Sequence, residues 1–228
     1  MPVPTIDPEL IGALSGYDSA TVQNAGILAR GHVDAAGDYS APGLERMVGG
    51  EEVIVGYAVT AELTPVTEQS ETLDWNEYHD LLAYTDAPLI VVLKDMDSPS
   101  RRGAIIGDGM AYRFTALGAV GAVVDGNARD VPGIEKAGLQ LWATGRVPGH
   151  GPFNLVHHSS EVEINGLRIS QGDILVCDGD GVTRVEPAAA AEVVKACAEV
   201  RKRESKLHQF FSTPGFSTAD YEIWKQDR

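Results

Sequence analysis

Short runs of β-branched residues alternate with helical segments through the middle of the chain, and this alternation restricts the fold more than any other feature. The runs VIVGYAVTAEL, from Val53, and PLIVVLKD, from Pro88, are bounded by Gly, Pro and Asp, as buried strands are. A helix over about residues 75–84 is predicted between them. The segments that follow are AII, a helix over about 110–117, GAVVD, a helix over 131–137, and LQLWA. Alternating strands and helices predict a parallel α/β sheet.

The segments on either side of this middle part have different patterns. Residues 1–45 are predicted to be mainly helical, because their apolar residues recur among polar ones at helical spacing. A helix cap is expected within Ser19 to Thr21. After Gly145, an Asn165-Gly166 pair indicates a tight hairpin, and two more short strands flank a Gly-rich turn at residues 178–181. An antiparallel part is therefore predicted to follow the parallel one, and we expect an α/β fold with a mixed sheet.

The C-terminal segment is predicted to form one helix, from about residue 188 to 210, and a tail in which Pro214 and Gly215 end regular structure. No internal repeat divides the chain. We expect a single domain over residues 1–228, made of a helical N-terminal part (1–45), a core (46–187) and a C-terminal helix and tail (188–228).

Charge and composition disfavour several kinds of partner. The chain has a formal net charge of -15, and such an acidic surface would be repelled by nucleic acid and by anionic membrane. No apolar stretch is long enough to span a membrane, and the start MPVPTIDPELIG lacks the features of a signal peptide, so we expect a cytoplasmic location. Cys177 and Cys197 are too few for a disulfide framework and are expected to be reduced thiols. A small anionic substrate would need a local positive group, such as an arginine or a metal ion.

Polar residues follow two of the predicted strands, at the point where each strand ends. Asp108 is expected just after one strand, AII, and Asp125, Arg129 and Asp130 just after the next. The carboxyl ends of neighbouring parallel strands meet at one edge of a sheet, where open α/β sheets bind ligands. The sequence therefore predicts a site at this edge.

Glycines beside Asp108 would let a ligand approach the backbone. Gly107 and Gly109 permit close contact, and the N–H groups of Gly109, Met110 and Ala111 at a helix start could hold an anion. The segment GDGMAY does not match the dinucleotide fingerprint, because its sixth residue is Tyr112.

Two of these motifs also have simpler structural interpretations. An isolated Arg129-Asp130 pair is most often a surface turn in which the aspartate caps the next helix, although the surrounding cluster lowers those odds. The DGDG segment at residues 178–181 lacks the spaced ligands and the closing glutamate of a calcium loop, so we interpret it as a hairpin turn.

Glu204 interrupts an apolar stripe on the last predicted helix. It either pairs with Arg201 or Lys206 at the margin of the stripe, or it delivers a carboxylate to a site across a subunit boundary. Both interpretations stay open. The other members of the stripe share one helix face: Val193, Cys197, Val200 and Leu207.

Histidines and a lysine offer rival chemistry. His157 and His158 point to opposite faces of a strand and so can hardly bind one ion, which makes a zinc site with His150 improbable. Lys94 ends the strand PLIVVLK and is placed for Schiff-base chemistry, although a lysine that anchors a strand end in solvent is commoner.

Three segments together carry a resemblance to a known family. GDGMAYRFTALGAVGAVVDGNARD, GLQLWATGRVP and INGLRISQGDILVCDGDGV resemble the 4-hydroxy-4-methyl-2-oxoglutarate aldolase family, also called the regulator of ribonuclease activity A (RraA)-like family. Order and spacing hold over roughly residues 15–205. The chain departs from the family pattern at Gln140, Trp142 and Asn165, which raises the question of a different specificity at the distal end of the substrate.

The resemblance implies a compact α/β/β/α swivelling fold, assembled as a trimer or hexamer with its site at the subunit boundary. Asp130 would hold Mg²⁺ or Mn²⁺ largely through waters, and Arg129 would bind the pyruvyl group of a 2-oxo acid. Asp108 would orient a metal-bound water, and the backbone of Gly109 and Met110 would take the pyruvyl carboxylate. Glu204 is the candidate for the acidic residue supplied by a neighbouring subunit.

The resemblance also implies a function. We expect a divalent-metal-dependent lyase that cleaves a C–C bond of 4-hydroxy-2-oxo-diacids to give pyruvate, with oxaloacetate decarboxylation as a second activity. The alternative is a non-catalytic binding protein that regulates a ribonuclease through a protein contact. A third reading is a Schiff-base aldolase that uses Lys94.

Overall fold

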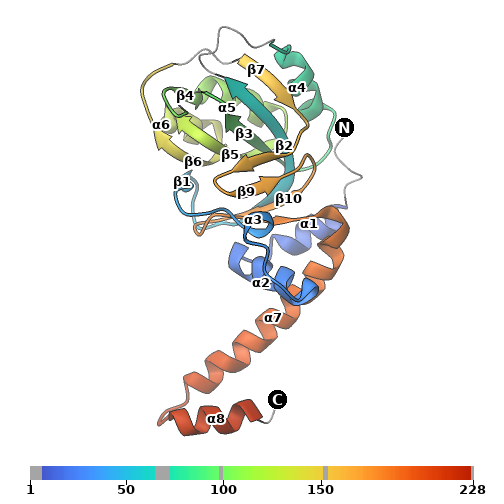
Figure 1. Ribbon diagram of the computed structural model, residues 1–228, viewed down its shortest axis with the longest axis vertical. Helices are drawn as coiled ribbons and strands as arrows, with labels where there is room; N and C mark the ends of the chain where they lie inside the picture. Colours follow the sequence, from blue (N-terminus) through green and yellow to red (C-terminus); the bar gives the residue numbers. More distant parts are fainter. Residues whose placement is uncertain (1–6, 65–71, 98–99, 151–153, 227–228) are drawn as a thin grey trace.

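The computed structural model describes residues 7–64, 72–97, 100–150 and 154–226 (Figure 1). The expectation that the chain begins without a signal peptide rests in part on residues 1–6, which lie outside these ranges. The helices are α1 (Pro8–Leu14), α2 (Ser19–Arg30), α3 (Ala35–Asp38), α4 (Trp75–Ala83), α5 (Asp108–Ala116), α6 (Val131–Ala137), the 3₁₀ turn η1 (Pro187–Ala189), α7 (Ala190–Phe211) and α8 (Thr218–Gln226). The strands are β1 (Glu45–Val48), β2 (Ile54–Thr64), β3 (Leu89–Asp95), β4 (Ala104–Ile106), β5 (Ala119–Ala128), β6 (Gln140–Arg146), β7 (Asn154–His158), β8 (Val162–Ile164), β9 (Leu167–Ile169), β10 (Ile174–Cys177) and β11 (Val182–Val185).

Within the described residues, nine strands form one mixed sheet in the order β1-β6-β5-β3-β2-β10-β11, with β4 beside β5 and β7 beside β2. The pairs β2–β3, β3–β5, β5–β6 and β4–β5 are parallel. The pairs that β1, β7, β10 and β11 make are antiparallel. The predicted α/β fold with a mixed sheet, parallel first and antiparallel later, is confirmed.

The sheet carries helices on one face and the β8–β9 hairpin on the other. Successive residues of β3 alternate between these faces, as strand geometry requires. Val91 packs in a core that includes residues of α1, α2, α4, α5, α6 and α7. Ile90 and Val92 pack on Ile164 and Leu167 of the hairpin. Burying each such side chain contributes about 1.5–3 kcal/mol, so both layers stabilise the sheet.

The β8–β9 hairpin turns at Asn165 and Gly166, as predicted. Their φ angles are 46° and 82°. A two-residue turn with positive φ at both positions matches the twist of the flanking strands, and Asn-Gly is the pair that adopts it most easily. The Asn165 side chain also donates to the carbonyl oxygens of Ala41 and Pro42.

The start of α2 differs from the sequence-based expectation, which placed its cap at Ser19 to Thr21. Asp18 is the cap, and its carboxylate accepts a hydrogen bond of 2.7 Å from the backbone N–H of Thr21. Ser19 instead binds Asp178, through its N–H at 2.6 Å and its hydroxyl at 2.8 Å. This contact bridges a long separation along the chain, which a local pattern does not reveal.

The tail after Gly215 was predicted to lack regular structure, and this prediction was wrong because α8 lies there. Both the N–H and the hydroxyl of Ser217 bind the carboxylate of Asp220, at 3.0 Å and 2.6 Å. This is the Ser-x-x-acid arrangement of helix starts. Trp224 of α8 stacks on Phe210 of α7, with ring centroids 5.1 Å apart.

Helix α7 extends well beyond the body of the molecule and ends at α8 (Figure 1). Its buried residues end at Val200, in the portion that packs on α2. We call residues 201–226, which comprise the outer part of α7 and all of α8, the arm. Across the described ranges, none of the helices combines the length and the apolar character that crossing a membrane requires.

Candidate active site

Two helices begin at the edge of the sheet where the parallel strands end. Gly107 alone separates β4 from α5, and Arg129 and Asp130 separate β5 from α6. Ile106 of β4 is paired with Ala128 of β5, and its carbonyl oxygen accepts a hydrogen bond of 3.0 Å from the N–H of Arg129. The starts of the two helices are therefore held against each other.

The guanidinium group of Arg129 makes one ion pair with the described residues, to Asp130. The side chain is 29% exposed, and its Nε lies 3.4 Å from Oδ2 of Asp130. This Nε is buried and makes no hydrogen bond with any described residue. The guanidinium can therefore still donate to a ligand, in the fork geometry that suits a carboxylate or a 2-oxo acid.

Asp130 occupies the cap position of α6 but does not cap it with its side chain. Its backbone is left-handed, with φ 54° and ψ 35°, and its carboxylate makes no capping bond. The simpler interpretation, a surface turn with Asp130 as helix cap, was wrong in this respect. Aspartate tolerates the left-handed region better than most residues, yet the conformation still has a cost. The outcome is a carboxylate that is 51% exposed and faces Arg129.

Asp108, the first residue of α5, lies against α6. A Cβ added at Gly133 would be 2.6 Å from Cβ and 2.8 Å from Oδ2 of Asp108, so only glycine fits there without displacement. On the other side, a Cβ at Gly107 would be 3.4 Å from Arg129 and 3.6 Å from Asp130. The structure thus brings the three predicted polar residues into one cluster, which we call the edge cluster: Asp108, Arg129 and Asp130.

The N-terminus of α5 is open to a ligand. Its cap position is Gly107, which has no side chain to bond the free N–H groups of the first turn. At Gly109 an added Cβ would meet no atom within 4 Å, so the backbone of Gly109 and Met110 borders free space. Free N–H groups and the helix dipole favour an anion at this point.

A hollow of about 380 Å³ adjoins the edge cluster on the α6 side. Arg146, which the sequence analysis did not single out, lines it together with Arg129 and Asp130. The signal lies in sheet order: Arg146 ends β6 and is paired with Ala128 of β5, directly before Arg129. Two guanidinium groups therefore border one hollow on a chain of strongly negative net charge.

Asp125 was predicted to come after the end of its strand, and this was wrong because it lies within β5. It belongs to a separate cluster, in which Lys94 binds it at 2.5 Å and Arg101 at 3.0 Å. Burial acts to raise the pKa of Asp125, but hydrogen bonds from Lys94 and Arg101 outweigh it and lower that pKa. The ion pair engages the Lys94 side chain, whereas Schiff-base chemistry requires an amine that is available to attack a carbonyl group.

Glu204 is not part of the edge cluster of its own chain. It lies on the arm and pairs with neither Arg201 nor Lys206, the two partners considered; Arg201 binds Asp18 instead. Glu204 is partly buried and makes no ion pair or hydrogen bond with a described residue. A catalytic role for Glu204 would therefore require a neighbouring chain.

Other candidate residues have structural partners. Asp178 of the DGDG segment accepts hydrogen bonds from Ser19 and from the N–H of Asp180, which supports the hairpin-turn interpretation. His158 lies beside Ser159 and Glu77, with its ring nitrogens 3.0 Å and 3.6 Å from their oxygens.

The three departures from the family pattern lie away from the edge cluster. Trp142 is fully buried under the hairpin and donates to the carbonyl oxygen of Asp178 at 2.8 Å. Gln140 binds Arg46 and Glu52 near the start of β6. Asn165 forms the hairpin turn. None of the three residues therefore has a recorded hydrogen bond or ion pair with the edge cluster of this chain.

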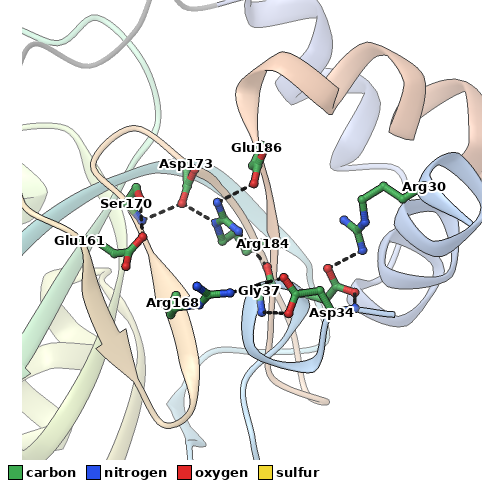
Figure 2. A network of polar contacts seen from close by, with 10 residues as sticks. Arg30, Asp34, Gly37, Glu161, Arg168, Ser170, Asp173, Arg184 and Glu186 are labelled. Atoms are coloured by element: carbon green, nitrogen blue, oxygen red, sulfur yellow. Dashed lines mark hydrogen bonds and ion pairs between the residues drawn. The ribbon is translucent and has the colours of Figure 1, made fainter. Parts of the chain in front are cut away.

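A second polar network lies between the N-terminal helices and the β10–β11 hairpin (Figure 2). Arg184 binds Asp173 at 2.5 Å, Glu186 at 3.0 Å and the carbonyl oxygen of Gly37 at 3.1 Å. Burial raises the pKa of Asp173, and its bonds to Arg184 and Ser170 act against that rise. Every charged side chain labelled in Figure 2 has a partner, so this network holds the fold together.

Comparison with known proteins adds the family context. A family model described as RraA-like (Aldolase/RraA) matches residues 24–184. An uncharacterized protein of Methanocaldococcus jannaschii is 22% identical over 168 residues, or 73% of this chain and 77% of that protein. Protein DlpA of Legionella pneumophila is 26% identical over 158 residues, which cover 68% of this chain but 25% of DlpA.

A solved structure has the same fold. RraAS2 of Streptomyces coelicolor, described as an unusual member of the RNase ES inhibitor RraA protein family, has a TM-score of 0.72 and 23% identity. The match covers 91% of this chain and 99% of RraAS2. At this identity the likeness extends to the fold alone.

Proposed function

The chain belongs to the RraA-like (Aldolase/RraA) family, and from this premise we propose that it is a divalent-metal-dependent lyase that cleaves a C–C bond of a 2-oxo acid to release pyruvate. The observation that carries the proposal is the edge cluster. It combines one guanidinium with two carboxylates that are not used for capping or for pairing elsewhere in the described chain. Groups left available in this way are typical of ligand sites.

The residues of the edge cluster fit a magnesium or manganese ion. Among the described residues, no three His, Cys, Asp or Glu side chains are grouped as metal ligands, so an ion here would rely on one or two carboxylates. Magnesium binds in this way, with waters and substrate completing its shell. Asp130 is half exposed and carries the free carboxylate that would hold the ion, with Asp108 close by. When bound, the ion would polarise the 2-oxo group of the substrate.

The chain itself would bind and orient the pyruvyl group. The free N–H groups of Gly109 and Met110 would receive the substrate carboxylate, and Arg129 would donate to the 2-oxo oxygen. When the C3–C4 bond breaks, its electron pair moves into the enolate of pyruvate, and the negative charge on the enolate oxygen faces the guanidinium of Arg129. That charge is greater in the transition state than in the substrate, so the contact accelerates the reaction.

Proton movement would involve Asp108 and a carboxylate from another chain. In an aldol cleavage the C4 hydroxyl loses its proton, and C3 of the enolate gains one to become the methyl group of pyruvate. Asp108 would accept a proton, directly or through one water. In oxaloacetate decarboxylation the C4 carboxylate leaves as CO₂, so only C3 protonation is needed.

We propose that the chain assembles as a trimer or hexamer, in which Glu204 reaches the edge cluster of a neighbour. This is supported by the position of Glu204 in α7, beyond Val200, where the buried residues of that helix end. The outer part of α7 extends away from the body (Figure 1). Asp130→Asn and Glu204→Gln should each be inactive alone, and mixed oligomers of the two should regain activity, because some sites then receive both native residues. If mixing restores nothing while the single variants are inactive, Glu204 does not act across a boundary.

A regulatory protein contact is the second candidate, and one observation favours it. The arm exposes apolar side chains, with Phe211 43%, Phe216 38% and Ile223 62% exposed. Exposed groups of this kind often mark protein interfaces. RraAS2, which shares the fold, is described as a member of an RNase ES inhibitor family.

The deciding experiment follows pyruvate release from oxaloacetate and from 4-hydroxy-4-methyl-2-oxoglutarate. Each reaction is run with Mg²⁺, with Mn²⁺ and with excess EDTA. Turnover that EDTA abolishes supports the lyase. Turnover that persists in EDTA, and that borohydride inactivates in the presence of pyruvate, would move the assignment to Lys94 chemistry. No turnover under any condition would favour the regulatory contact.

A further inference from the structure

A second hollow borders the other side of the α5 start and is distinct in character from the edge cluster. It measures about 270 Å³ and lies between α4 and α5. Its lining is mainly aromatic and apolar, with one cationic side chain at the rim. The residues that form it are Trp75, His79, Gly109, Met110 and Arg113.

His79 gives this hollow a buried ring nitrogen to which no described residue is hydrogen-bonded. The residue is 8% exposed. Its Nδ1 is buried and makes no hydrogen bond with a described residue. Nδ1 atoms that are buried and unpaired are unfavourable unless a ligand or water binds them. Burial, with a smaller contribution from the charge of Arg113, lowers the pKa of His79, so the ring is neutral near pH 7 and can accept or donate one hydrogen bond.

The walls of the hollow suit a flat apolar group. The Trp75 ring stacks on His79, with centroids 5.5 Å apart and planes inclined by 22°. Met110 adds a flexible apolar side chain, and Arg113 is exposed at the rim. Aromatic and thioether side chains bind planar apolar groups through dispersion and stacking.

The hollow and the edge cluster both adjoin the first turn of α5. Gly109 lines the hollow, and a Cβ added at Gly107, two residues earlier, would lie 3.4 Å from Arg129 and 3.6 Å from Asp130. Two residues span at most about 7.6 Å between Cα atoms, which is close to the length of a four- or five-carbon chain. In the proposed binding mode the carboxylate lies on the N–H groups of Gly109 and Met110 and the 2-oxo oxygen faces Arg129, so C3 is directed away from Arg129. The distal end can then turn past Gly109, which has no side chain, toward His79.

We propose that the α4–α5 hollow is the distal subsite of the enzyme and selects 2-oxo acids that carry an aromatic or other planar apolar group at C4. This inference rests on the proposed lyase function. The substrate class is a 4-hydroxy-2-oxo acid with an aryl substituent. Its C3–C4 bond breaks, the C4 hydroxyl proton passes to a base, C4 becomes an aldehyde, and C3 takes a proton to give pyruvate.

The first test compares two substrates that differ only in their use of the hollow. Oxaloacetate has no group beyond the carboxylate that it loses, whereas 4-hydroxy-2-oxo-4-phenylbutanoate places its ring at the distal subsite. We expect Trp75→Ala to lower the ratio of kcat/KM for the phenyl substrate to that for oxaloacetate at least tenfold. His79→Phe, which keeps a ring but removes both nitrogens, should lower the same ratio to a smaller extent.

Matched controls are exposed aromatic residues on the same two helices. Tyr84 follows α4 and is 84% exposed, and Tyr112 of α5 is 53% exposed; neither lines the hollow. Tyr84→Ala and Tyr112→Ala should leave the ratio within twofold of wild type. An unchanged ratio in a folded Trp75→Ala protein, with oxaloacetate still turned over, would overturn the distal subsite and leave the lyase assignment intact.

A binding measurement needs no variant and no turnover. Calorimetric titration of the wild-type chain in Mg²⁺ should give phenylpyruvate at least tenfold higher affinity than pyruvate, since only phenylpyruvate carries a ring. Equal affinities would overturn the subsite, even if Trp75→Ala failed to fold. If neither substrate is turned over, the proposed lyase function is wrong. The hollow would still be an aryl-binding site if phenylpyruvate bound tenfold more tightly than pyruvate and Trp75→Ala abolished that difference.

Discussion

The network around Arg184 and the edge cluster are both built from arginine and aspartate, yet their side chains are paired very differently. Arg184 binds two carboxylates and a carbonyl oxygen. Arg129 has one ion pair at 3.4 Å, and its Nε makes no hydrogen bond with a described residue. Where charges only stabilise the fold, they are satisfied within the chain. Where they are left available, the chain has kept capacity for a ligand.

The same contrast holds for helix starts in the described chain. Four helices, α1 to α4, are each capped by an aspartate side chain, whereas α5 and α6 are not capped by any side chain although an aspartate lies at the start of each. A side-chain cap contributes about 1 kcal/mol. The edge cluster forgoes that stabilisation at two adjacent helices. The capping aspartates are Asp7, Asp18, Asp34 and Asp74.

Asp130→Asn should lower activity more than any other variant. If it did not, the contrast between an available edge cluster and a fully paired Arg184 network would not hold. Asparagine keeps the shape and tolerates the left-handed backbone but has no charge for a metal ion. We expect kcat/KM for oxaloacetate to fall at least about 1000-fold, which corresponds to about 4 kcal/mol. The free energy of unfolding should stay within about 0.5 kcal/mol of wild type in urea titrations. Retained turnover would exclude Asp130 from the site.

Arg184→Leu should give the opposite pattern, a loss of stability without a loss of catalysis. It would leave the Asp173 carboxylate, whose side chain is 6% exposed, without its cationic partner. Breaking a buried ion pair in this way costs about 3 kcal/mol. Urea denaturation measures this loss, and kcat/KM of the folded protein should stay within twofold of wild type. A variant as stable as wild type would show that the network does not stabilise the fold.

Gly133→Ala should affect both properties, because its new methyl group would lie 2.6 Å from Cβ of Asp108. Overpacking costs about 1–3 kcal/mol, and displacement of Asp108 should lower kcat/KM at least tenfold. Gly12→Ala in α1 is the matched control, since a Cβ there meets no atom within 4 Å. It should stabilise the protein slightly through helix propensity. If Gly133→Ala and Gly12→Ala changed stability and kcat/KM equally, the packing of Gly133 on Asp108 would not position the Asp108 carboxylate.

Asp18→Ala should give the smallest effect, a loss of about 1 kcal/mol of stability with unchanged activity. Burial acts to raise the pKa of Asp18, but hydrogen bonds from Thr21 and the charge of Arg201 outweigh it and lower that pKa. The contribution of the carboxylate is therefore present above its unfolded pKa of about 3.9 and is lost as pH falls below it. Unfolding curves of the variant and wild type should converge below about pH 4. A constant difference down to pH 2 would contradict this cap.

Local signals predicted most of the fold. The Asn165-Gly166 turn and the β-branched runs of β3 and β5 were read correctly because turn geometry and strand burial depend on neighbouring residues. The Ser217 to Asp220 box that starts α8 carried a local signal too, but the preceding Pro214 and Gly215 were taken as the end of regular structure.

Other features depend on contacts between distant segments and could not be read from local patterns. Strand β5 continues through Asp125 because Lys94 and Arg101 satisfy its charge inside the sheet. The approach of Asp108 to Arg129 and Asp130 was predictable from the rule that ligands bind at the carboxyl ends of parallel strands. Arg146 was missed because its place beside Arg129 follows from the β5–β6 pairing.

Helix α7 is continuous over 22 residues, but its two halves do not share one source of stability. Up to Val200 it is buried against α2 and should open only when the whole core unfolds. Beyond that point it depends on its own backbone hydrogen bonds and on the aromatic contacts with α8, and short helices without such burial are marginal in water. In an isolated copy of the chain, amide hydrogen exchange along this one helix should therefore be graded, slow before Val200 and fast after Glu204. A partner that covers the arm would slow exchange there without changing that of the core.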